Sequence, residues 1–521
     1  MESVPSNTIT KRNDEGNNEE AITNHKPSKL PKIAINASRS RGELKLIQHL
    51  VEKNKGFGWK MAYGLEGNVM WSGMAIPWEE TYIACEMHLN RIPGAADISE
   101  KKLTGFYLNK FQEYFPENYD FYPKTFLLPE NTQELQEYMK SNPNKTFIAK
   151  PTAGCQGDGI ILFKKFQDLP SSPYSNAFKD IVVQEYIDNP LLIRGKKFDL
   201  RMYVLISNVK PMIAFLNEEG LARFCTKDYQ KPNSSNLRDL YMHLTNYSLN
   251  KLSPNYKYTE ECIEINEGTK RTFTSFWKSV EKEGYDKNKI MENIKDLIKK
   301  LLISLEPYLQ FSYNVAYEGK DDGKCFHVLG IDILLDDELK PWLLEINANP
   351  SMCIDFEEHS DEKKKPVSVI CPVDLFVKEK VMEDAILISR KKPAKQKELT
   401  KYGSFELIYN GEGSSDYGMA IFKEILEIFG KLSGAKFKTG LTSGKFIKLA
   451  SLPNMTSSGL TKADYDILYK KLVQNSADKQ MDFATFVQAL ETLAEKLIKD
   501  MNATNKNQHM SVFIHSILSN L

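Results

Sequence analysis

The sequence predicts an α/β (α+β) fold over most of the chain, followed by a small all-α region. Residues 327–349 form two apolar runs on either side of a short acidic turn, a pattern typical of paired β-strands. Between residues 146 and 306, further apolar runs alternate with glycine-bearing loops and a helical pattern. From about residue 417 onward, apolar residues recur at helical spacing. We therefore expect a mixed core and a separate helical module.

The composition is that of a protein with substantial hydrophobic cores. The chain has 521 residues, of which 41% are hydrophobic, so it is long enough for more than one domain. Lys plus Arg and Asp plus Glu both total 69, so net charge favours neither nucleic acid nor a membrane surface. The seven cysteines lack a CxxC pair, and no apolar run reaches the roughly 18 residues of a membrane span. A cytoplasmic protein with no nucleic-acid or membrane partner is expected.

Changes in composition divide the chain into five expected parts. Residues 1–32 contain no Phe, Trp or Tyr and are predicted to be a disordered tail. An N-terminal domain rich in aromatic residues is expected at 33–130, followed by central and C-terminal lobes at 131–390. Residues 391–416 begin with a basic cluster and are interpreted as a linker, and the helical module occupies 417–521.

Three helical patterns are assigned to packing and not to chemistry. They cover residues 101–115, 286–306 and 373–386, and in each the apolar residues share one face.

A glycine-bearing loop is the first candidate binding site. It contains Gly154, Gly157 and Gly159 and joins strands predicted at 146–150 and 160–163. Glycine lets the backbone N–H groups approach anionic oxygens, and Lys150 adds a positive charge. The loop is neither a Walker loop nor a GxGxxG motif opening a helix, so it indicates a phosphate-covering hairpin of another nucleotide fold.

A charged strand follows at residues 197–204. Lys197, Asp199, Arg201 and Tyr203 share one face, while the alternating apolar residues line the other. Lys, Asp and Arg on one face of an otherwise apolar strand suit a triphosphate and its metal. A solvated sheet edge would give the same alternation, so both interpretations remain open.

The paired strands at 327–349 carry three possible oxygen ligands. An antiparallel register centred on the acidic turn places Asp332 opposite Glu345, and the two-residue period places Asn347 on the same face. Two neighbouring carboxylates and an amide favour a hard cation such as Mg²⁺ or Mn²⁺ beside substrate phosphates. The alternative is an ordinary hairpin whose acidic residues face water.

Taken together, these segments resemble the tubulin tyrosine ligase-like family, and most closely its polyglutamylase members, over about residues 60–390. The motifs are Lys150-Pro-x-x-Gly-x-Gln-Gly-x-Gly-Ile160, Gln184-Glu-Tyr-Ile187, Lys197-Phe-Asp-Leu-Arg201, Met242-His-Leu-Thr-Asn-Tyr-Ser248 and Leu344-Glu-Ile-Asn-x-Asn-Pro-Ser351. The resemblance implies an ATP-grasp ligase fold. It also implies a reaction in which ATP phosphorylates an acceptor carboxylate and the amine of free L-glutamate then displaces phosphate.

The resemblance also implies roles for individual residues. Arg201, Arg223 and Glu345 would be catalytic, and Asp332, Glu345 and Asn347 would hold Mg²⁺ or Mn²⁺. The residues that would bind ATP are Lys150, Gln156, Gly157, Gln184, Glu185, Tyr186, Ile187, Lys197, Phe198, Asp199, Thr245 and Asn246. Those that would bind glutamate or its acceptor are Gln156, Arg223, Tyr247, Ser248 and Lys270.

Substrate choice is the part of this resemblance that leaves alternatives open. Arg223 with Lys270 favours glutamate over glycine, because glycine has no side-chain carboxylate to pair with a second cation. Lys270 could instead belong to a solvated Lys-Arg pair. At Ala348 several chain-elongating members carry His, so the resemblance does not distinguish starting a glutamate branch from lengthening one. A protein glycylase and a non-catalytic microtubule or axoneme component are the two rival functions.

The expected partners and location follow from the same resemblance. Acidic tubulin tails on microtubules would be the partner of a monomeric enzyme in the cytoplasm and cytoskeleton, including the cilium, axoneme or basal body. The basic cluster at 390–397 would attract such tails, although a solvated linker has the same composition.

The C-terminal module resembles p25-alpha domains, which have an EF-hand-like fold. Its loop after residue 474 lacks the ligands of a calcium site. If Asn475 opened such a loop, the third, fifth, sixth and twelfth positions would be Ala477, Lys479, Gln480 and Phe486. We therefore predict no calcium binding.

Overall fold

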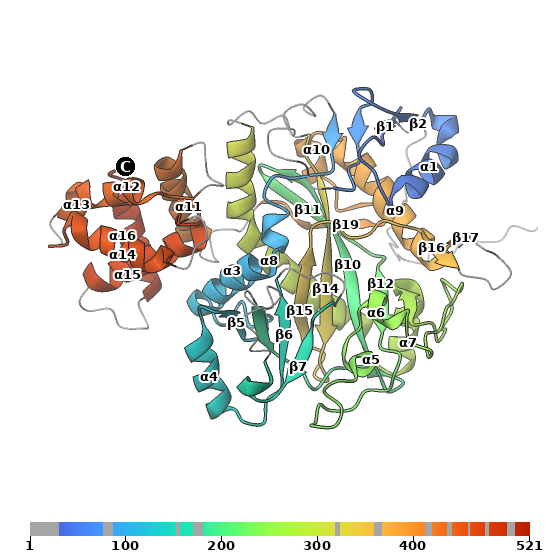
Figure 1. Ribbon diagram of the computed structural model, residues 1–521. Helices are drawn as coiled ribbons and strands as arrows, with labels where there is room; N and C mark the ends of the chain where they lie inside the picture. The colour runs from blue at the N-terminus through green and yellow to red at the C-terminus, as the bar shows by residue number, and fades with distance from the viewer. Residues whose placement is uncertain are drawn as a thin grey trace, which may run out of the picture.

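A long β-strand, β10 (Lys196–Val209), forms the centre of the molecule in the computed structural model (Figure 1). The structure describes residues 31–74, 76, 87–152, 157–169, 181–317, 324–358, 367–411, 419–434, 440–456, 459–474, 479–497 and 506–521. The predicted tail at 1–32 lies almost entirely outside this part of the chain.

The main sheet runs in the order β13-β12-β10-β11-β19-β18, with β14 paired to both β10 and β15, and β9 paired to β10. Its other strands are β9 (Leu192–Ile193), β11 (Met212–Asn217), β12 (Leu221–Phe224), β13 (Lys270–Thr272), β14 (His327–Leu335), β15 (Pro341–Asn347), β18 (Lys401–Tyr402) and β19 (Phe405–Tyr409). The sheet is antiparallel at each of these pairings. The β10 strand exceeds its predicted length by five residues at the C-terminal end, where Leu205 to Val209 pair with β11 and β14.

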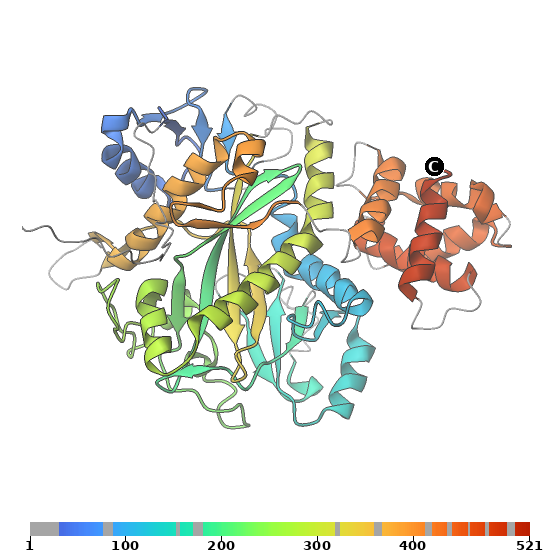
Figure 2. The same ribbon diagram turned by 180° about the vertical axis from the view of Figure 1, so that it is seen from behind.

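The two faces of β10 pack against different layers, as the sequence alternation predicts. Phe198, Leu200 and Met202 belong to the hydrophobic core under α8 (Lys287–Ala316), which crosses this face of the sheet in Figure 2. Tyr203 and Leu205 belong to a second core that includes α9 (Pro372–Ser389) and the N-terminal domain. Each face is therefore covered, and the charged residues of β10 lie where the second layer gives way to a pocket.

The N-terminal domain contains a parallel sheet of order β2-β1-β3-β4. Its elements are β1 (Ala34–Asn36), α1 (Leu44–Lys53), η1 (Lys55–Phe57), β2 (Lys60–Ala62), β3 (Val69–Met70), β4 (His88–Leu89), η2 (Asp97–Ser99) and α3 (Lys101–Tyr114). The α1 helix packs on α9 through the pairs Lys53–Glu379 and Lys53–Glu383.

A smaller antiparallel sheet of order β5-β8-β6-β7 carries the predicted glycine hairpin. Its elements are β5 (Thr125–Leu128), α4 (Thr132–Ser141), β6 (Phe147–Pro151), β7 (Ile161–Phe163), η3 (Phe166–Asp168) and β8 (Ile181–Glu185). The predicted strands at 146–150 and 160–163 are confirmed to within one residue.

Short elements complete the core. They are α5 (Leu240–His243), α6 (Tyr247–Asn250), α7 (Phe273–Lys282), β16 (Asp355–Glu358), β17 (Val367–Ile370) and α10 (Pro393–Lys397). The predicted helix at 286–306 continues through Pro307 to Ala316, since Leu309 and Tyr313 extend its buried stripe. No helix of the described residues combines the length and apolar character needed to cross a membrane.

The segment interpreted as a basic linker is more ordered than a linker. The β19 strand pairs with β11 and so extends the main sheet, and α10 begins at Pro393, where a missing N–H costs nothing. Within the basic cluster, Arg390 donates from Nη1 to the Asn68 backbone oxygen at 3.2 Å, whereas Lys392 and Lys395 are exposed.

The C-terminal module is helical, as predicted, and lies beside α3 and the end of α8 (Figures 1 and 2). Its elements are α11 (Met419–Ser433), α12 (Ser443–Phe446), η7 (Ile447–Ser451), α13 (Pro453–Thr456), α14 (Lys462–Val473), α15 (Phe483–Leu497) and α16 (Lys506–Leu518). Leu441 and Met481 join two of its loops by backbone hydrogen bonds of 2.8 and 2.9 Å. The α16 helix packs on α11 and α15 and is absent from the sequence-based expectation.

Candidate active site

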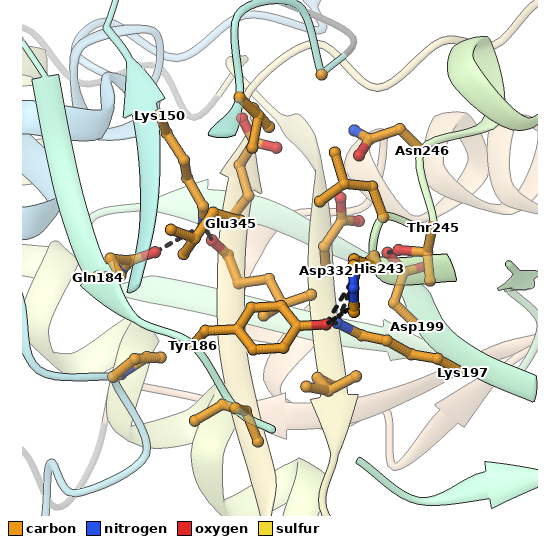
Figure 3. Close-up of a pocket in the computed structure, with 18 of the residues that line it drawn as sticks. Lys150, Gln184, Tyr186, Lys197, Asp199, His243, Thr245, Asn246, Asp332 and Glu345 are labelled. Carbon is orange, nitrogen blue, oxygen red and sulfur yellow. Dashed lines mark hydrogen bonds between the residues drawn. The ribbon is translucent and has the colours of Figure 1, made fainter. Parts of the chain in front are cut away.

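One pocket gathers most of the predicted site residues between the small sheet and the main sheet (Figure 3). The β6 and β8 strands supply one wall, while β10, β14 and β15 supply the other. The predicted residues that line it are Lys150, Gly157, Gln184, Glu185, Tyr186, Ile187, Lys197, Asp199, Arg223, Thr245, Asn246, Asp332 and Glu345. Segments far apart in the sequence are therefore brought to a single cavity.

Lys150 is held by the small sheet and points into this pocket (Figure 3). Its Nζ donates to Gln184 Oε1 at 2.6 Å, and Gln184 Nε2 in turn donates to Thr125 Oγ1 at 2.9 Å. Burial lowers the pKa of Lys150 to about 8, against the attraction of Glu345. The lysine has no carboxylate hydrogen-bonded to it among the described residues, so an anionic ligand would gain a strong partner here.

Lys197 is the second buried cation of the pocket. Its Nζ donates to Tyr186 Oη at 2.8 Å and to the His243 backbone oxygen at 2.9 Å, and it lies 4.2 Å from the centre of the Tyr186 ring. Burial lowers the pKa of Lys197 to about 8, and repulsion from Lys150 acts in the same direction. Two lysines that burial makes easier to deprotonate therefore face one cavity.

His243 contacts Lys197 and Tyr186, although sequence reasoning gave it no role. Its Nδ1 lies 3.3 Å from Tyr186 Oη and its Nε2 lies 3.1 Å from the Asn236 backbone oxygen. Burial and the neighbouring Lys197 charge lower the pKa of His243 to about 4. The imidazole is therefore neutral near pH 7, which adds no further positive charge beside Lys197.

A chain of alternating charges crosses β10, β12 and β14. Arg223 donates from Nε and Nη2 to the two Asp199 oxygens, both at 2.7 Å, and its Nη2 also lies 2.7 Å from Asp332 Oδ2. Arg201 donates hydrogen bonds to the same Asp332 from Nε and from Nη2, the latter at 2.9 Å. Thr245 Oγ1 donates to Asp199 at 2.5 Å. The side chains meet because β10 pairs Asp199 with Arg223 and Arg201 with Asp332.

These guanidinium groups keep Asp332 ionised. Burial alone would raise its pKa, but Arg201 and Arg223 lower it to about 2. The carboxylate is therefore available as an oxygen ligand at neutral pH.

The predicted register of the paired strands is confirmed. Asp332 lies opposite Glu345 and Gly330 lies opposite Asn347, with a β-bulge directly after Asp332. Asn347 Nδ2 lies 3.5 Å from Asp332 Oδ2, so the amide and the carboxylate are adjacent. Glu345 lies 3.6 Å from Lys101 Nζ at the start of α3. The alternative of a hairpin with all its acidic residues in water does not hold, because the Asp332 side chain is only 6% exposed.

Among the described residues, no three His, Cys, Asp or Glu side chains lie together as a possible metal site. Asp332, Glu345 and Asn347 instead combine two carboxylates with an amide. These are the oxygen ligands that Mg²⁺ prefers.

Lys270 lies next to Arg223 but does not line the pocket. The β12–β13 register pairs the two residues, yet Lys270 Nζ contacts Asp374 and lies 4.4 Å from the centre of the Tyr247 ring. Burial opposes its charge, but Asp374 raises the pKa of Lys270 above its usual value. With a side chain 9% exposed, Lys270 is not part of a solvated pair.

Other expected residues also fall outside the pocket lining. The Phe198 side chain points to the opposite face of β10 and packs on Phe224 and Phe276, with ring centres at 5.5 and 5.0 Å, so its assignment to the ATP site needs correction. Strand alternation places it there, since its neighbours Lys197 and Asp199 face the pocket. Tyr247 and Ser248 lie in α6 beside the pocket, whereas Gln156 lies outside the described residues.

Gly157 shows why the loop needs glycine at this position. Its φ is +89°, and an added Cβ would lie 3.1 Å from Asn246 Cγ across the pocket mouth. A larger residue would therefore strain the backbone and crowd Asn246.

Sequence reasoning also missed Lys101 and the apolar walls of the pocket. Lys101 was assigned with its helix to packing, although its position at the first turn exposes it to the cavity. Ile148, Ile160, Leu334 and Leu344 line the remaining walls. The strand period could have identified Ile148, because it lies two positions from Lys150 on the same face of β6. Leu344 follows no such period, since the register of β14 and β15 skips it at the β-bulge.

Comparisons with known proteins show which families this chain resembles. The model of the tubulin-tyrosine ligase family matches residues 81–369, and the p25-alpha model matches residues 423–516. Tubulin polyglutamylase ttll6 of Danio rerio is 41% identical over 268 residues, which are 51% of this chain and 33% of that protein. The probable beta-tubulin polyglutamylase of Tetrahymena thermophila is 36% identical over 338 residues, 63% of this chain and 26% of that protein.

A further relative matches over most of the chain. Tubulin polyglutamylase TTLL11 of Homo sapiens is 30% identical over 516 residues, which cover 90% of this chain and 71% of the human protein. Since the family model spans more than half of the chain and includes the pocket residues of β6, β8, β10, β14 and β15, this chain belongs to the tubulin-tyrosine ligase family.

Proposed function

We propose that the chain is an ATP- and Mg²⁺-dependent tubulin polyglutamylase. In this proposal it joins free L-glutamate to glutamate side chains or chains on the acidic tails of tubulin. The relatives carry that activity in their names, and the chain spans only 33% and 26% of the first two of them. The activity therefore rests on the pocket itself.

The observation that carries the proposal is the meeting of Asp332, Glu345 and two arginines opposite two buried lysines. Lys150 and Lys197 supply positive charge for a polyphosphate, and Asp199 with Thr245 supplies polar groups beside it. Burying these charges costs desolvation free energy, and a non-catalytic scaffold would gain nothing that offsets this cost.

The residues fit a magnesium ion by their chemistry. Asp332 is ionised at neutral pH, Glu345 lies opposite it, and Asn347 adds an amide oxygen after rotation of its side chain. These three side chains would hold the ion, with the remaining ligands from phosphate and water. When bound, the ion neutralises phosphate charge during transfer.

The reaction proceeds in two displacements. An oxygen of the acceptor carboxylate attacks the γ-phosphorus of ATP, the bond to ADP breaks, and an acyl phosphate forms on the acceptor. The glutamate nitrogen then attacks the acyl carbon, phosphate leaves with the former carboxylate oxygen, and the nitrogen loses a proton. Lys150 and Lys197 orient the polyphosphate, while Arg201 and Arg223 stabilise charge that develops beside Asp332.

Arg223 and Lys270 support glutamate as the incoming amino acid. They are paired across β12 and β13, so two cations are available for the two carboxylates of glutamate. Lys270 would exchange its contact with Asp374 for a substrate carboxylate, and Lys378 would remain at Asp374 at 2.8 Å. A glycylase would leave the second cation without a partner.

The remaining expectations belong to the same proposal. The enzyme acts as a monomer on microtubules in the cytoplasm and cytoskeleton, including cilia. Its domain boundaries follow those given by composition, except that β18 and β19 belong to the main sheet and β5 belongs to the small sheet. The C-terminal module has paired loops, with Leu441 bonded to Met481, which supports an EF-hand-like fold. The expectation of no calcium rests on the sequence of the loop after residue 474, of which residues 475–478 lie outside the described residues.

A ligation assay tests the proposal. The full chain is incubated with microtubules, ATP, Mg²⁺ and either glutamate or glycine, and the tubulin tails are weighed by mass spectrometry. We expect glutamate mass to be added and glycine mass to be absent. The Glu345→Gln variant should add neither, whereas Glu338→Gln, in the exposed turn before β15, serves as the matched control and should retain activity. Addition of glycine alone, or of neither amino acid, would contradict the proposal.

A further inference from the structure

A second pocket lies at the edge of the main sheet, on the far side of the strands that carry the active site. Its volume is about 710 Å³. Neighbouring residues in the sequence line opposite pockets. Lys196, Phe224 and Met242 line this second pocket, whereas their neighbours Lys197, Arg223 and His243 line the first. The two pockets therefore share their walls back to back.

Arg271 is the central side chain of this second pocket. The residue is only 4% exposed, its Nε donates to the Gly268 backbone oxygen at 2.7 Å, and its guanidinium lies 4.0 Å from the centre of the Phe224 ring. Its Nη1 is buried and has no hydrogen-bond partner in the described part of the chain. The site therefore contains a buried cation with an unused donor.

The acidic side chains near Arg271 form ion pairs with other cations. Lys196 pairs with Asp228 at 3.0 Å, and Lys227 pairs with Asp239 at 2.7 Å. Glu267 pairs with Lys257 at 2.6 Å and with Arg194 at 3.1 Å. Within the described ranges, no carboxylate forms an ion pair with Arg271.

A buried guanidinium with an unpaired N–H group favours binding of an anionic ligand. An unpaired N–H group in the protein interior costs free energy, and a ligand that accepts its hydrogen bond removes that cost. The planar fork of arginine matches a carboxylate, and the surrounding lysines add positive potential. Burial and repulsion from Arg194 lower the pKa of Arg271 to about 10, so it stays protonated at neutral pH.

The position of Arg271 relates this pocket to the acceptor. Arg271 and Lys270 are neighbours on the edge strand β13, and strand alternation points them to opposite faces, Lys270 towards Arg223 and Arg271 towards the second pocket. An extended acidic chain that passes over this edge can therefore place one carboxylate at each face.

We propose that the pocket around Arg271 binds a carboxylate side chain of the acidic acceptor tail while another part of that tail occupies the active site. This inference rests on the proposed function for its choice of ligand. Free glutamate has the same carboxylate chemistry, but it cannot span the sheet edge. A tail that occupies both pockets gains from two linked contacts, whereas free glutamate gains from one.

The test measures binding of a fluorescently labelled oligoglutamate peptide to the full chain in the absence of ATP, with an oligoglutamine peptide for comparison. Arg271→Ala should weaken oligoglutamate binding by about tenfold, since a charge-assisted hydrogen bond is lost. Lys227→Ala removes a partly exposed charge from the same pocket without disturbing the core and should weaken binding by about threefold. Lys278→Ala, which removes a charge from α7 outside both pockets, should leave binding unchanged.

Two results would overturn the inference. One is equal oligoglutamate affinity for the parent chain, Arg271→Ala and Lys227→Ala. The other is full competition by free glutamate at the same concentration of carboxylate, which would identify a site for the free amino acid. If the peptide binds as expected but no amino acid is ligated to tubulin, the proposed function fails and this site remains. If ligation occurs with an unchanged KM for the tail in Arg271→Ala, the function stands and this site is excluded.

Discussion

In the proposed function, the two buried lysines of the pocket would determine how ATP binding depends on pH. Burial lowers the pKa of both Lys150 and Lys197 to about 8, from ordinary values near 10.5. Both are protonated below pH 8 and lose their charge as pH rises above it. A bound triphosphate favours the protonated forms, so ATP binding should raise both pKa values and take up protons.

We therefore expect ATP affinity to fall above pH 8, by at most about tenfold per pH unit for each lysine. Isothermal titration near pH 8 in two buffers of different ionisation enthalpy measures the accompanying proton uptake. His243 should not contribute, because its pKa of about 4 keeps it neutral throughout this range. Constant affinity from pH 7 to 9 would show that these lysines do not contact the phosphates.

Arg201 illustrates a side chain whose geometry matters as much as its charge. Nε and Nη2 both donate to Asp332, and a lysine cannot reproduce this fork. We expect Arg201→Lys to lower kcat/KM for ligation by about 10²-fold, the scale for loss of one electrostatic donor in an active site. Arg194→Lys, in an exposed turn, is the matched control and should retain full activity. A loss of less than threefold in Arg201→Lys would refute this role.

At the scale of whole elements, α3 connects the helical module to the ligase core. Phe111 of α3 stacks on Phe422 of α11 at 4.7 Å between ring centres, and Tyr107 stacks on Phe483 of α15 at 6.0 Å. Tyr114 Oη donates to Glu491 Oε1 at 2.6 Å, and Lys110 pairs with the same carboxylate at 2.8 Å. The described part of the interface is therefore an aromatic core beside a partly buried ion pair.

Truncating the central ring of this interface should loosen the module. Phe422→Ala should destabilise the docked state by about 3–5 kcal/mol, the usual cost of removing a buried phenylalanine. Hydrogen exchange of α11 and α3 amides should then quicken, while exchange in β10 stays slow. Ile467→Ala, on a side chain 65% exposed in α14, should change neither. Unaltered exchange in α11 of the Phe422 variant would argue against this interface.

Some elements could be predicted from the sequence, namely those with a strong hydrophobic period and a pairing partner nearby in the chain. The alternation of charged and apolar residues predicted the charged face of β10. The short turn predicted the register that places Asp332 opposite Glu345. The strand β19 could not be predicted in this way, because its partner β11 lies about 190 residues earlier and only the folded sheet offers that free edge. The α16 helix does carry a signal, since Met510, Ile514 and Ile517 recur at helical spacing and are buried.

The site was predicted least well where side chains depend on tertiary neighbours. The family resemblance assigned Arg223 and Lys270 to one substrate, and the two residues are paired in the structure. Asp374, which contacts Lys270, belongs to the distant α9 helix and was not predicted. Lys101 likewise joins the pocket only because α3 packs beside β15. Sequence patterns identify which residues carry charge, whereas their partners depend on packing between distant segments.

At the scale of the whole molecule, the α3 helix connects the pocket to the helical module. One end of α3 begins at Lys101, beside Glu345, and the other end carries Tyr114, bonded to Glu491 of α15. The 14-residue α3 helix thus runs from the pocket to the module. The module and the pocket should therefore be treated as one unit, and activity should be measured on the full chain.

Transfer of a labelled oxygen tests the central claim of ATP-dependent ligation most directly. Acceptor peptides with heavy-oxygen-labelled side-chain carboxylates are incubated with the full chain, ATP, Mg²⁺ and glutamate, and the released phosphate is analysed by mass spectrometry. The two-displacement reaction predicts one heavy oxygen in each phosphate formed by the parent chain, and no phosphate above background from Glu345→Gln. Ligated peptide accompanied by unlabelled phosphate, or label transfer that persists in Glu345→Gln, would contradict the account.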